Sequence, residues 1–587
     1  MNYLETINTP SDIKNMSVPE LNTLAKEIRT AILNRVSQTG GHVGPNLGAV
    51  EIIIALHYVF NSPTDKFIFD VSHQSYAHKI LTGRKYGFLN KEYFNQISGY
   101  TNPQESEHDL FMVGHTSTSI SLACGVAKAR DFAKRNENVI ALIGDGSLGG
   151  GEALEGLNFA SELNSNLIII INDNEMSIAE NHGGLYKNLR LLRETKGTAQ
   201  NNMFKAWGLD YQYISDGHNI ETLIQTFKQI KNINNPIVLH IHTTKGKGFS
   251  FAEKNKEYWH YQMPFNLQTG ESTFQYSTGE NYNTLTVNYL TQKVKQNKNI
   301  VVLTAGTPGA LGFSPEKRLE MGKNLIDVGI MEEHAVAMCS GLAKNGAKPI
   351  FWVLSPFVQR TYDQLSHDLA LNNNPAIILV SWNGIMGNDA THLGTFDIPM
   401  MSNIPNLVCL APTSKEEYFA MLEWATNNQS QPIVIRVPSM VFSASVPVDA
   451  DYDNLNQFQT IQTGNTVAIC ALGSFLPLGY QVLEELKKQK INATLINPRF
   501  YSGIDTHLLN NLKENHQLVV TLEDGELDGG FGEKISRFYG SSNMKVLNFG
   551  AKKEFTDRIP LEKLYEKYHL TPDLIVQDIC TTLKKSQ

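Results

Sequence analysis

The sequence predicts an α/β fold in which mostly parallel sheets are covered by helices. Short aliphatic runs alternate along the whole chain with helical patterns of apolar residues, which is typical of parallel sheets and not of sandwiches or bundles. Most of these runs end at glycine or a polar turn. The length of 587 residues suffices for three or four domains of ordinary size. We therefore expect several α/β domains in one chain.

Seven runs are predicted to be buried strands because they are short, aliphatic and bounded by turns. They are residues 139–143, 167–171, 237–241, 300–304, 377–381, 467–472 and 518–522. Two stretches rich in small and polar residues, 266–283 and 449–465, are predicted to be linkers. These linkers divide the chain into three expected domains, at 1–275, 285–448 and 460–587.

Composition and charge exclude several classes of protein. The chain is 41% hydrophobic and 18% charged, which fits globular cores and not a disordered or collagenous protein. A net charge of -8 gives no general reason to expect nucleic acid or an anionic membrane as partner. The five cysteines are scattered singly, so neither a disulfide framework nor a structural zinc site is indicated. Without an apolar signal core or a membrane-spanning run, the protein is expected to be cytoplasmic.

The segment 139–178 predicts a site for Mg²⁺ and a diphosphate. It reads as strand, loop, helix, strand and loop, and both loops of such a unit emerge at the carboxyl ends of neighbouring parallel strands. Asp145 and Asn174 should therefore lie side by side, and with a backbone carbonyl such as that of Met176 they form an oxygen set suited to Mg²⁺. The glycines that would let backbone amides approach an anion are Gly144, Gly146, Gly149, Gly150 and Gly151. GDG alone would be read as a tight turn, but the NDNEMSI sequence after the second strand favours the metal site.

This pair of loops resembles the diphosphate motif of thiamine-diphosphate enzymes. Other segments narrow the resemblance to the 1-deoxy-D-xylulose-5-phosphate synthase family, and they run through nearly the whole chain in family order. They are residues 40–51 (GGHVGPNLGAVE), 69–84 (FDVSHQSYAHKILTGR), 113–121 (VGHTSTSIS), 216–219 (DGHN), 244–253 (TKGKGFSFAE), 331–343 (MEEHAVAMCSGLA), 355–370 (SPFVQRTYDQLSHDLA) and 391–397 (THLGTFD). The third domain is similar more loosely, through GSFLPLG, NPRF and LEDGELDGGFGE.

The resemblance implies a fold, a reaction and an assembly. The fold would comprise three transketolase-like domains that bind the diphosphate, bind the pyrimidine and form the C-terminus. The reaction would join pyruvate to an aldehyde, glyceraldehyde 3-phosphate in the family, with loss of carbon dioxide and with thiamine diphosphate and Mg²⁺ as cofactors. The protein would be a homodimer that acts on small molecules, with the cofactor between the first and second domains.

The resemblance also implies roles for individual residues. Glu332 would activate the cofactor from beside its pyrimidine ring, and Phe357 would stack on that ring. The histidines expected near the reacting carbons are His42, His73 and His392. The expected substrate-binding residues are His260, on a mobile loop, and Arg360 and Asp389, in the cavity wall. The cofactor-binding set is His73, Gly114, His115, Thr116, Gly144, Gly146, Ser147, Asn174, Met176, Lys245, Glu332 and Phe357, and the metal ligands are Asp145, Asn174 and Met176.

The chain departs from the family pattern around the acceptor's phosphate. The family holds this phosphate with two arginines, and at the aligned positions this chain carries Asn383 and Ser439. Pro45 and Leu354 likewise replace a serine and a tyrosine, whereas Arg436 matches a different arginine. Asn and Ser lack the permanent charge and the fork of Arg. Losing two contacts of about 1.5–3 kcal/mol each would weaken phosphate capture about a hundredfold or more.

Four functions follow from these observations, with a decarboxylating carboligase of the family type as the leading one. The others are a related enzyme with a different or non-phosphorylated acceptor, a transketolase-type transfer of a ketol unit, and a non-catalytic paralogue that binds the cofactor. The HQSYAHKILTGR and NDNEMSI sequences favour carboligation over ketol transfer, and the retained Glu332 and histidines argue against a mere binder. The segment 179–203 is short where the family has a long, often mobile one, which would change how the cavity closes.

Overall fold

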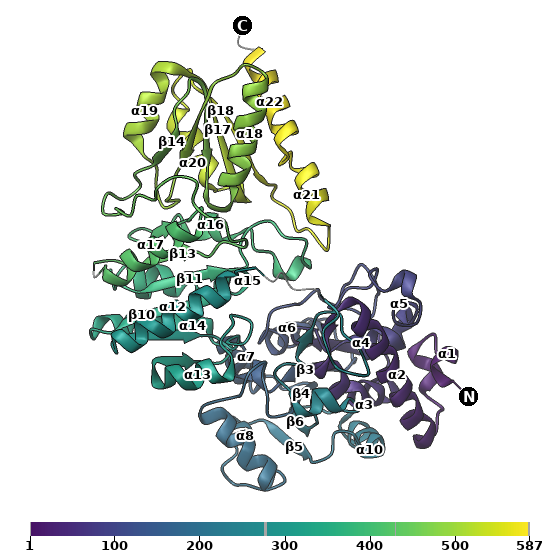
Figure 1. The fold of residues 1–587 in the computed structure, drawn as a ribbon. Coiled ribbons are helices and arrows are strands. Elements are labelled where there is room, and N and C mark those ends of the chain that lie inside the picture. The colour runs from purple at the N-terminus through teal and green to yellow at the C-terminus, as the bar shows by residue number, and fades with distance from the viewer. Residues whose placement is uncertain (1, 275–278, 429, 585–587) are drawn as a thin grey trace. The chain divides into compact units, whose positions relative to one another are not determined.

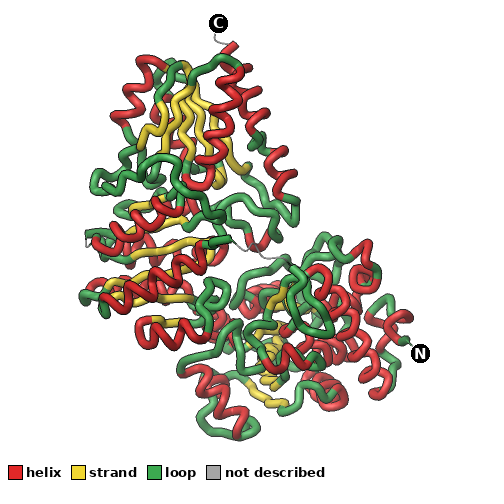
Figure 2. Tube along the Cα trace, in the orientation of Figure 1, coloured by secondary structure: helices red, strands yellow, loops and turns green. Residues whose placement is uncertain are grey.

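The computed structural model of the protein describes residues 2–274, 279–428 and 430–584. The chain forms two compact units, Met1–Ser277 with Gly329–Met331 and Thr278–Val328 with Glu332–Gln587 (Figure 1). Among the described residues the first unit holds one large sheet and the second unit holds two. The strands of each sheet lie side by side between helices (Figure 2). This arrangement confirms the predicted fold class.

The large sheet of the first unit has five parallel strands in the order β2-β3-β4-β6-β5. Its central strands, β3 and β4, are buried along nearly their whole length, as expected for parallel strands covered on both faces. Two further short strands, β1 and β7, form an antiparallel ribbon. The strands of this unit are β1 (Gly41–His42), β2 (Lys66–Phe69), β3 (Val139–Gly144), β4 (Leu167–Asp173), β5 (Asp210–Ile214), β6 (Pro236–His242) and β7 (Tyr261–Gln262).

The helices of the first unit form for local reasons that the sequence shows. In α10, Ile220, Leu223 and Phe227 recur at helical spacing on one buried face, and the Asn219 side chain accepts a hydrogen bond from the N–H of Thr222 at its start. The helices and helical turns are α1 (Tyr3–Thr6), η1 (Pro10–Ile13), α2 (Val18–Thr39), α3 (Gly44–Val59), α4 (Tyr76–Lys79), η2 (Ile80–Arg84), α5 (Tyr86–Leu89), η3 (Lys91–Tyr93), α6 (Ser119–Phe132), η4 (Gly146–Gly149), α7 (Gly151–Ala160), α8 (Gly184–Glu194), α9 (Met203–Ala206), α10 (Ile220–Ile230) and α11 (Ser250–Lys254).

The second unit begins with a six-stranded parallel sheet in the order β12-β13-β11-β10-β8-β9. Its strands are β8 (Ile300–Thr304), β9 (Leu325–Asp327), β10 (Lys348–Leu354), β11 (Ile377–Ser381), β12 (Val408–Leu410) and β13 (Ile433–Arg436). Its helices and helical turns are α12 (Tyr282–Gln296), α13 (Pro315–Met321), η5 (Gly322–Asn324), α14 (Glu332–Lys344), α15 (Ser355–Val358), η6 (Gln359–Thr361), η7 (Gln364–Ala370), η8 (Ala390–His392), α16 (Asp397–Met401) and α17 (Lys415–Asn427).

The last sheet has the order β14-β16-β15-β17-β18 and is parallel except for its antiparallel edge strand β14. Its strands are β14 (Gln459–Gln462), β15 (Thr466–Ala471), β16 (Ala493–Asn497), β17 (His516–Glu526) and β18 (Lys545–Ala551). Its helices and helical turns are η9 (Gly473–Phe475), α18 (Leu476–Lys488), α19 (Thr506–Asn515), α20 (Phe531–Tyr539), α21 (Leu561–Lys567) and α22 (Pro572–Lys584).

Each of the seven predicted strands corresponds to an observed one, β3, β4, β6, β8, β11, β15 and β17, with ends that differ by at most a few residues. The predicted linker 449–465 lacks regular structure until β14, and the predicted linker 266–283 includes residues 275–278, which lie outside the described residues. The boundaries 1–275, 285–448 and 460–587 stay predictions, because the second and third expected domains belong to one compact unit.

Arg436, at the end of β13, connects the two sheets of the second unit. Its Nε lies 2.6 Å from Asp397 Oδ2, and its Nη1 lies 2.5 Å from Asp524 Oδ1 on β17. All three side chains are buried. Gly384 approaches Asp524 so closely that an added Cβ would lie 2.6 Å from its Oδ2. The charge of Arg436 is therefore committed to holding the two sheets together.

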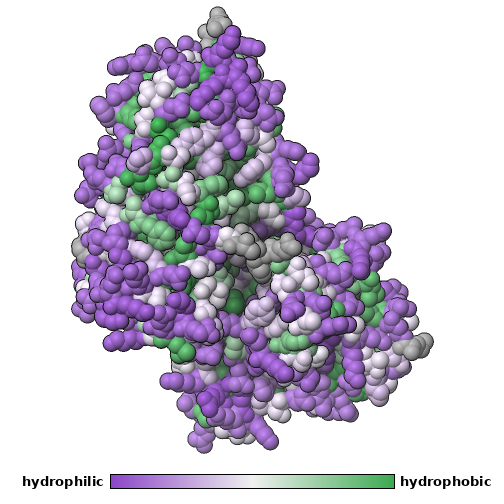
Figure 3. Space-filling model, viewed as in Figure 1, coloured by the Kyte–Doolittle hydropathy of each residue, from purple (hydrophilic) through white to green (hydrophobic). Residues whose placement is uncertain are grey.

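The surface agrees with the composition. The face in Figure 3 is mostly hydrophilic, with apolar side chains showing between the charged ones. Within the described ranges no helix has both the length and the apolar character that crossing a bilayer requires.

Replacing Arg436 with Ala should destabilise the second unit by about 3–5 kcal/mol, because two buried carboxylates would lose their cation. Thermal unfolding of this variant should be compared with that of Arg537→Ala, in which an exposed arginine of α20 is lost. An Arg436→Ala protein with the same melting temperature as its control would contradict a structural role for the buried ion pairs of Arg436.

Candidate functional site

Asp145 and Asn174 lie together at the carboxyl ends of two adjacent parallel strands. Gly144 of β3 pairs with Asn172 of β4, and the backbone N–H of Asp145 donates to the carbonyl of Asn172 (3.2 Å). Asn174 follows β4 by one residue. Strand pairing thus brings the two residues side by side across a sequence separation that a helix fills.

The Asp145 carboxyl is buried beside a second carboxyl, that of Asp173. Burial and the Asp173 charge raise the pKa of Asp145 well above its ordinary value. Burial also acts on Asp173, but His240 (Nε2 to Oδ2, 2.7 Å) and Arg193 (Nη1 to Oδ2, 2.5 Å) outweigh it and lower the pKa of Asp173 to about 2. Asp173 is thus paired with Arg193, and a divalent cation beside Asp145 would favour the charged form of the Asp145 carboxyl.

Two further oxygen donors complete the set that a hard cation would need. Asn174 Oδ1 is buried and has no hydrogen-bond partner within the described residues. The loop is folded back by an isolated bridge between Met176 and Glu180, which fixes the backbone there. No cluster of three or more His, Cys, Asp or Glu suited to a metal occurs in the described part of the chain. One carboxylate, one amide and one carbonyl fit Mg²⁺ better than a soft metal.

Close packing explains three of the five glycines in this loop. An added Cβ at Gly146 would lie 2.6 Å from Ser177, and one at Gly149 would lie 2.6 Å from both Met331 and Tyr186. A Cβ at Gly150 would meet Ser117. The corresponding positions at Gly144 and Gly151 face open space within the described structure. The glycines thus let neighbouring segments pack directly against the backbone of η4, which is buried, and leave Ser147 and Leu148 as its side chains.

The loop that carries Gly114, His115 and Thr116 is tied to this cradle. Asp70, directly after β2, accepts hydrogen bonds from the backbone N–H groups of Ser117 (2.9 Å) and Ser119 (3.0 Å). Ser117 Oγ donates to the carbonyl of Ser147 (2.7 Å). Asp70 is buried and was missed by the sequence analysis, although its place after a strand was a usable signal.

Lys245 is buried at the same loops and is not a surface lysine. Its Nζ donates to the carbonyl of Ser177 (2.5 Å). Burial lowers the pKa of Lys245 to about 7, against the opposing effect of Asp145. A phosphate group beside this amine would favour its charged form.

Three of the predicted histidines form one cluster in the first unit. The ring of His42 lies 5.0 Å from that of His73 and 5.5 Å from that of His260, and His73 stacks on His260 at 5.4 Å. Burial, followed by the charges of Lys245, His73 and His42, lowers the pKa of His260 well below its ordinary value. The backbone on either side of His42 is hydrogen-bonded to the segment that carries His260, through Val43 N to His260 O (3.2 Å).

Asn46 joins the loops of the first two histidines and was not foreseen. Its Nδ2 donates to the carbonyls of His42 (2.8 Å) and His73 (2.7 Å), and its Oδ1 accepts from the N–H of Tyr76 (2.9 Å). Both N–H groups and the oxygen of the Asn46 amide thus hold the loops of two candidate catalytic residues in place.

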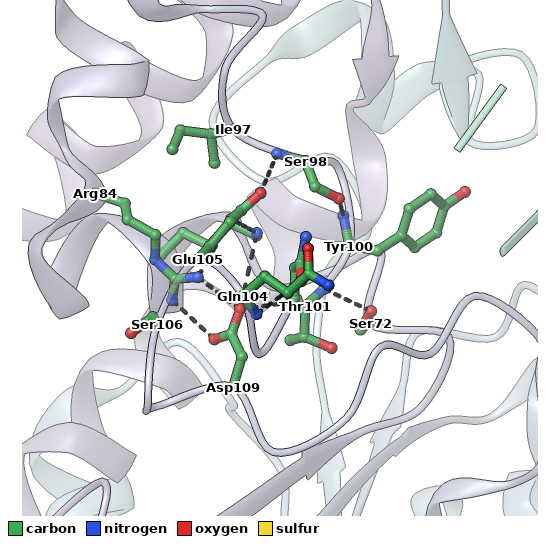
Figure 4. A network of polar contacts seen from close by, with 12 residues as sticks. Ser72, Arg84, Ile97, Ser98, Tyr100, Thr101, Gln104, Glu105, Ser106 and Asp109 are labelled. Atoms are coloured by element: carbon green, nitrogen blue, oxygen red, sulfur yellow. Dashed lines mark hydrogen bonds and ion pairs between the residues drawn. The ribbon is translucent and has the colours of Figure 1, made fainter. Parts of the chain in front are cut away.

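A buried network of polar contacts joins Arg84 to the loop that ends at Asp109 (Figure 4). Arg84 donates two hydrogen bonds to Asp109, at 2.5 and 2.8 Å. Asp109 also accepts from the backbone N–H of Asn102 (2.7 Å). The same loop carries Tyr100, whose ring lies 5.8 Å from that of His42. The network therefore positions an aromatic side chain against the histidines.

The second unit contains the remaining candidates, beginning with Glu332 at the start of α14. This side chain is buried, and its Oε2 lies 4.0 Å from Arg360 Nη1. Burial raises the pKa of Glu332 to about 7 despite the favourable charge of Arg360. Glu332 can thus gain or lose a proton near neutral pH.

Phe357 lies on α15, directly after β10, and Asp389 and His392 lie at η8, which follows β11. The rings of Phe357 and His392 are 5.6 Å apart in an edge arrangement. Asp389 Oδ1 lies 3.7 Å from Nε of Arg558, which comes from the loop after β18. The N–H of Ala390 donates to Asp557 beside that arginine (3.0 Å).

The residues that depart from the family pattern do not replace the two expected arginines. Asn383 Nδ2 donates to the carbonyls of Val380 (2.7 Å) and Val437 (3.0 Å). Ser439 is exposed, whereas Pro45 and Leu354 are buried. Because Arg436 is held by two carboxylates, it cannot take over from the expected arginines.

Comparisons with known proteins agree with the order of the motifs. The sequence model described as 1-deoxy-D-xylulose-5-phosphate synthase matches residues 4–200 and 190–243. Models of the transketolase pyrimidine-binding domain and the transketolase C-terminal domain match residues 281–442 and 456–575.

Curated relatives are similar over their whole length. The chain is 37% identical to 1-deoxy-D-xylulose-5-phosphate synthase of Clostridium tetani over 618 positions, covering 99% of each chain. It is 38% identical to that of Clostridium acetobutylicum, covering 99% of this chain and 98% of the relative. A solved transketolase from Campylobacter jejuni is 17% identical with a TM-score of 0.45, covering 96% of this chain and 100% of that chain.

Replacing Asp145 with Asn should weaken the binding of Mg²⁺ together with thiamine diphosphate about 10- to 100-fold, because a charge-assisted contact to the cation is lost. Calorimetric titration of the apo protein measures this directly. Asp210→Asn, at the exposed start of β5, is the matched control. Equal affinities in the two variants would remove Asp145 from the metal site.

The apo protein should lose stability relative to Glu332→Gln as pH rises from 5 to 8. The folded chain retains the Glu332 proton up to a pKa of about 7, whereas the unfolded chain releases it near 4.5, so the contribution falls across that window. The shift corresponds to at most about 3 kcal/mol. Melting temperatures at both pH values, with Glu333→Gln as control, test this. If the difference in melting temperature between wild type and Glu332→Gln is the same at both pH values, the raised pKa of Glu332 is contradicted.

Proposed function

The chain belongs to the 1-deoxy-D-xylulose-5-phosphate synthase family, and from this premise we propose that it joins pyruvate to an aldehyde with release of carbon dioxide, using thiamine diphosphate and Mg²⁺. It is a transferase of the transketolase superfamily. The observation that carries the proposal is the meeting of Asp145 and Asn174 beside the glycine-lined start of η4. This arrangement suits a divalent cation that carries a diphosphate.

The chain's residues fit the cofactor. Asp145, Asn174 Oδ1 and the carbonyl of Met176 would hold Mg²⁺, and Lys245 with the backbone of η4 would hold the diphosphate. The loop with Gly114, His115 and Thr116 would close the site from its other side. When bound, thiamine diphosphate supplies a nucleophilic carbon for the ketone of pyruvate and a sink for the electrons that decarboxylation releases.

Glu332 would exchange a proton with the pyrimidine ring, on which Phe357 would stack. A carboxyl with a pKa of about 7 is matched to proton transfer at neutral pH. Arg360, at 4.0 Å, favours the carboxylate form and limits how far burial raises that pKa. The buried position excludes water from the proton's path.

The histidine cluster would bind pyruvate and handle protons at its reacting carbon. His260 is kept neutral by burial, so one ring nitrogen donates and the other accepts. The rings of His42 and His73 lie 5.5 and 5.4 Å from that of His260, and both would donate to a developing oxyanion. His392 and Asp389 would contact the acceptor.

A specific observation favours a second candidate, the same chemistry with an acceptor that lacks a phosphate. Asn383 is committed to two backbone carbonyls, Ser439 carries no charge, and Arg436 is buried in ion pairs. Arg558 lies near Asp389 but is shared with the carboxylate of Asp557. A phosphate dianion at this end would therefore meet a site without a dedicated arginine. A transketolase-type ketol transfer has no comparable support.

The same premise supports an assembly and a location. We expect a homodimer in the cytoplasm, with three domains near 1–275, 285–448 and 460–587. The expected substrates are small molecules, and a net charge of -8 gives no general electrostatic reason to expect nucleic acid as a partner.

Pyruvate consumption by the purified protein tests the reaction and its acceptor together. Carbon dioxide release should require both thiamine diphosphate and Mg²⁺, and protein that leaves pyruvate untouched with every aldehyde would overturn the proposal. Glyceraldehyde 3-phosphate should be compared with glyceraldehyde, glycolaldehyde and hydrophobic aldehydes by kcat/KM. A phosphate preference below about tenfold is expected if two charge-assisted contacts are missing. A preference of a thousandfold would rule out the second candidate.

A further inference from the structure

The segment 179–203, between the metal loop and α9, is short and folded. It contains α8, whose Leu189 and Leu192 are buried, and it ends where Asn188 is hydrogen-bonded to the backbone of residues 201 and 203. The alignment with the Clostridium tetani relative runs over 618 positions, more than the length of this chain, so gaps fall in this chain. The two matches to the family model meet at residues 190–200, inside this segment.

Three side chains of this segment reach the loops after β3 and β4. Asn181 Nδ2 donates to Asp145 Oδ2 (2.8 Å). The hydroxyl of Tyr186 donates to the carbonyl of Gly146 (3.2 Å). Arg193, at the last turn of α8, donates to Asp173 Oδ2 (2.5 Å), and its other terminal nitrogen lies 3.4 Å from Glu175. One short helix thus contacts both loops.

We propose that 179–203 is a fixed clamp that holds the metal and diphosphate loops in their binding geometry, with Asn181, Tyr186 and Arg193 as its positioning residues. Asn181 fixes the rotation of the Asp145 carboxylate through its hydrogen bond to Oδ2. Tyr186 holds the Gly146 carbonyl and with it the start of η4. Arg193 holds the second loop through Asp173. The inference rests on the proposed function, because it gives these loops a cofactor to bind.

Physical reasons favour a clamp over a passive connection. Groups that hydrogen-bond to a metal ligand set its orientation, and their loss typically lowers metal affinity 10- to 100-fold. Tyr186 and Arg193 come from a helix whose buried leucines anchor it beside β4, and Asn181 lies three residues before that helix, so the geometry of the contacts is set before any ligand arrives. A binding loop ordered in advance loses less conformational entropy when its ligand binds.

The test compares variants that remove one polar contact each: Asn181→Ala, Tyr186→Phe and Arg193→Gln. The control is Arg190→Gln on the same helix, whose arginine is 72% exposed and forms an ion pair with Glu194. Two quantities are measured, the affinity for Mg²⁺ with thiamine diphosphate by calorimetry, and amide hydrogen exchange of residues 145–150 and 173–177 in the apo protein. Each variant should bind about tenfold more weakly and exchange faster at those loops, whereas the control should match wild type.

The outcomes separate the clamp from the proposed function. If wild-type protein does not bind Mg²⁺ with thiamine diphosphate, the proposed function is overturned. Amide hydrogen exchange of the two loops in the apo proteins would still show whether the clamp orders them. Cofactor binding with variants that equal the control in both affinity and exchange would overturn the clamp alone. Tyr186→Phe removes a single hydroxyl, so it guards against an effect that comes only from misfolding.

Discussion

A carboxylate held away from water is unstable unless a cation faces it, and the burial of Asp145 imposes this constraint on the first unit. Asp173 nearby uses His240 and Arg193 for its own charge. Asp145 is surrounded by an amide, a buried lysine and the glycine-rich backbone of η4, which together form a polar site suited to a cation and its anion. The strand order and the short helix α8 both act to keep this site in shape.

The other candidate groups obey the same rule in different ways. Glu332 is buried near a single arginine, which leaves its proton easily exchanged. His260 avoids the cost of buried charge because burial lowers the pKa of its ring and keeps it neutral. Arg436 shows the contrasting case, in which a buried charge is fully matched by two carboxylates and serves structure alone. Glu332 and Arg436 thus represent two cases, a buried carboxyl whose proton can exchange near neutral pH and a buried cation held in ion pairs.

The fold was predictable from the sequence because parallel strands leave a strong local signal. The runs at 139–143 and 167–171 are aliphatic throughout, and their ends place Asp145 and Asn174 together. Contacts between distant segments left no such signal. Asn46 and Asp70 act through backbone hydrogen bonds across 27 to 49 residues, and no periodicity reports them. The role of 179–203 was likewise hidden, since its shortness suggested a missing flap and not a folded clamp.

Electron paramagnetic resonance of Mn²⁺ in place of Mg²⁺ tests the central claim most directly, that Asp145 and Asn174 build a site for a cation bound to a diphosphate. With thiamine diphosphate present, the protein should bind about one Mn²⁺ per chain and show hyperfine coupling to ³¹P, and Asp145→Ala should abolish the signal. Mn²⁺ that stays in its free aquated form in wild-type protein with thiamine diphosphate would contradict the account.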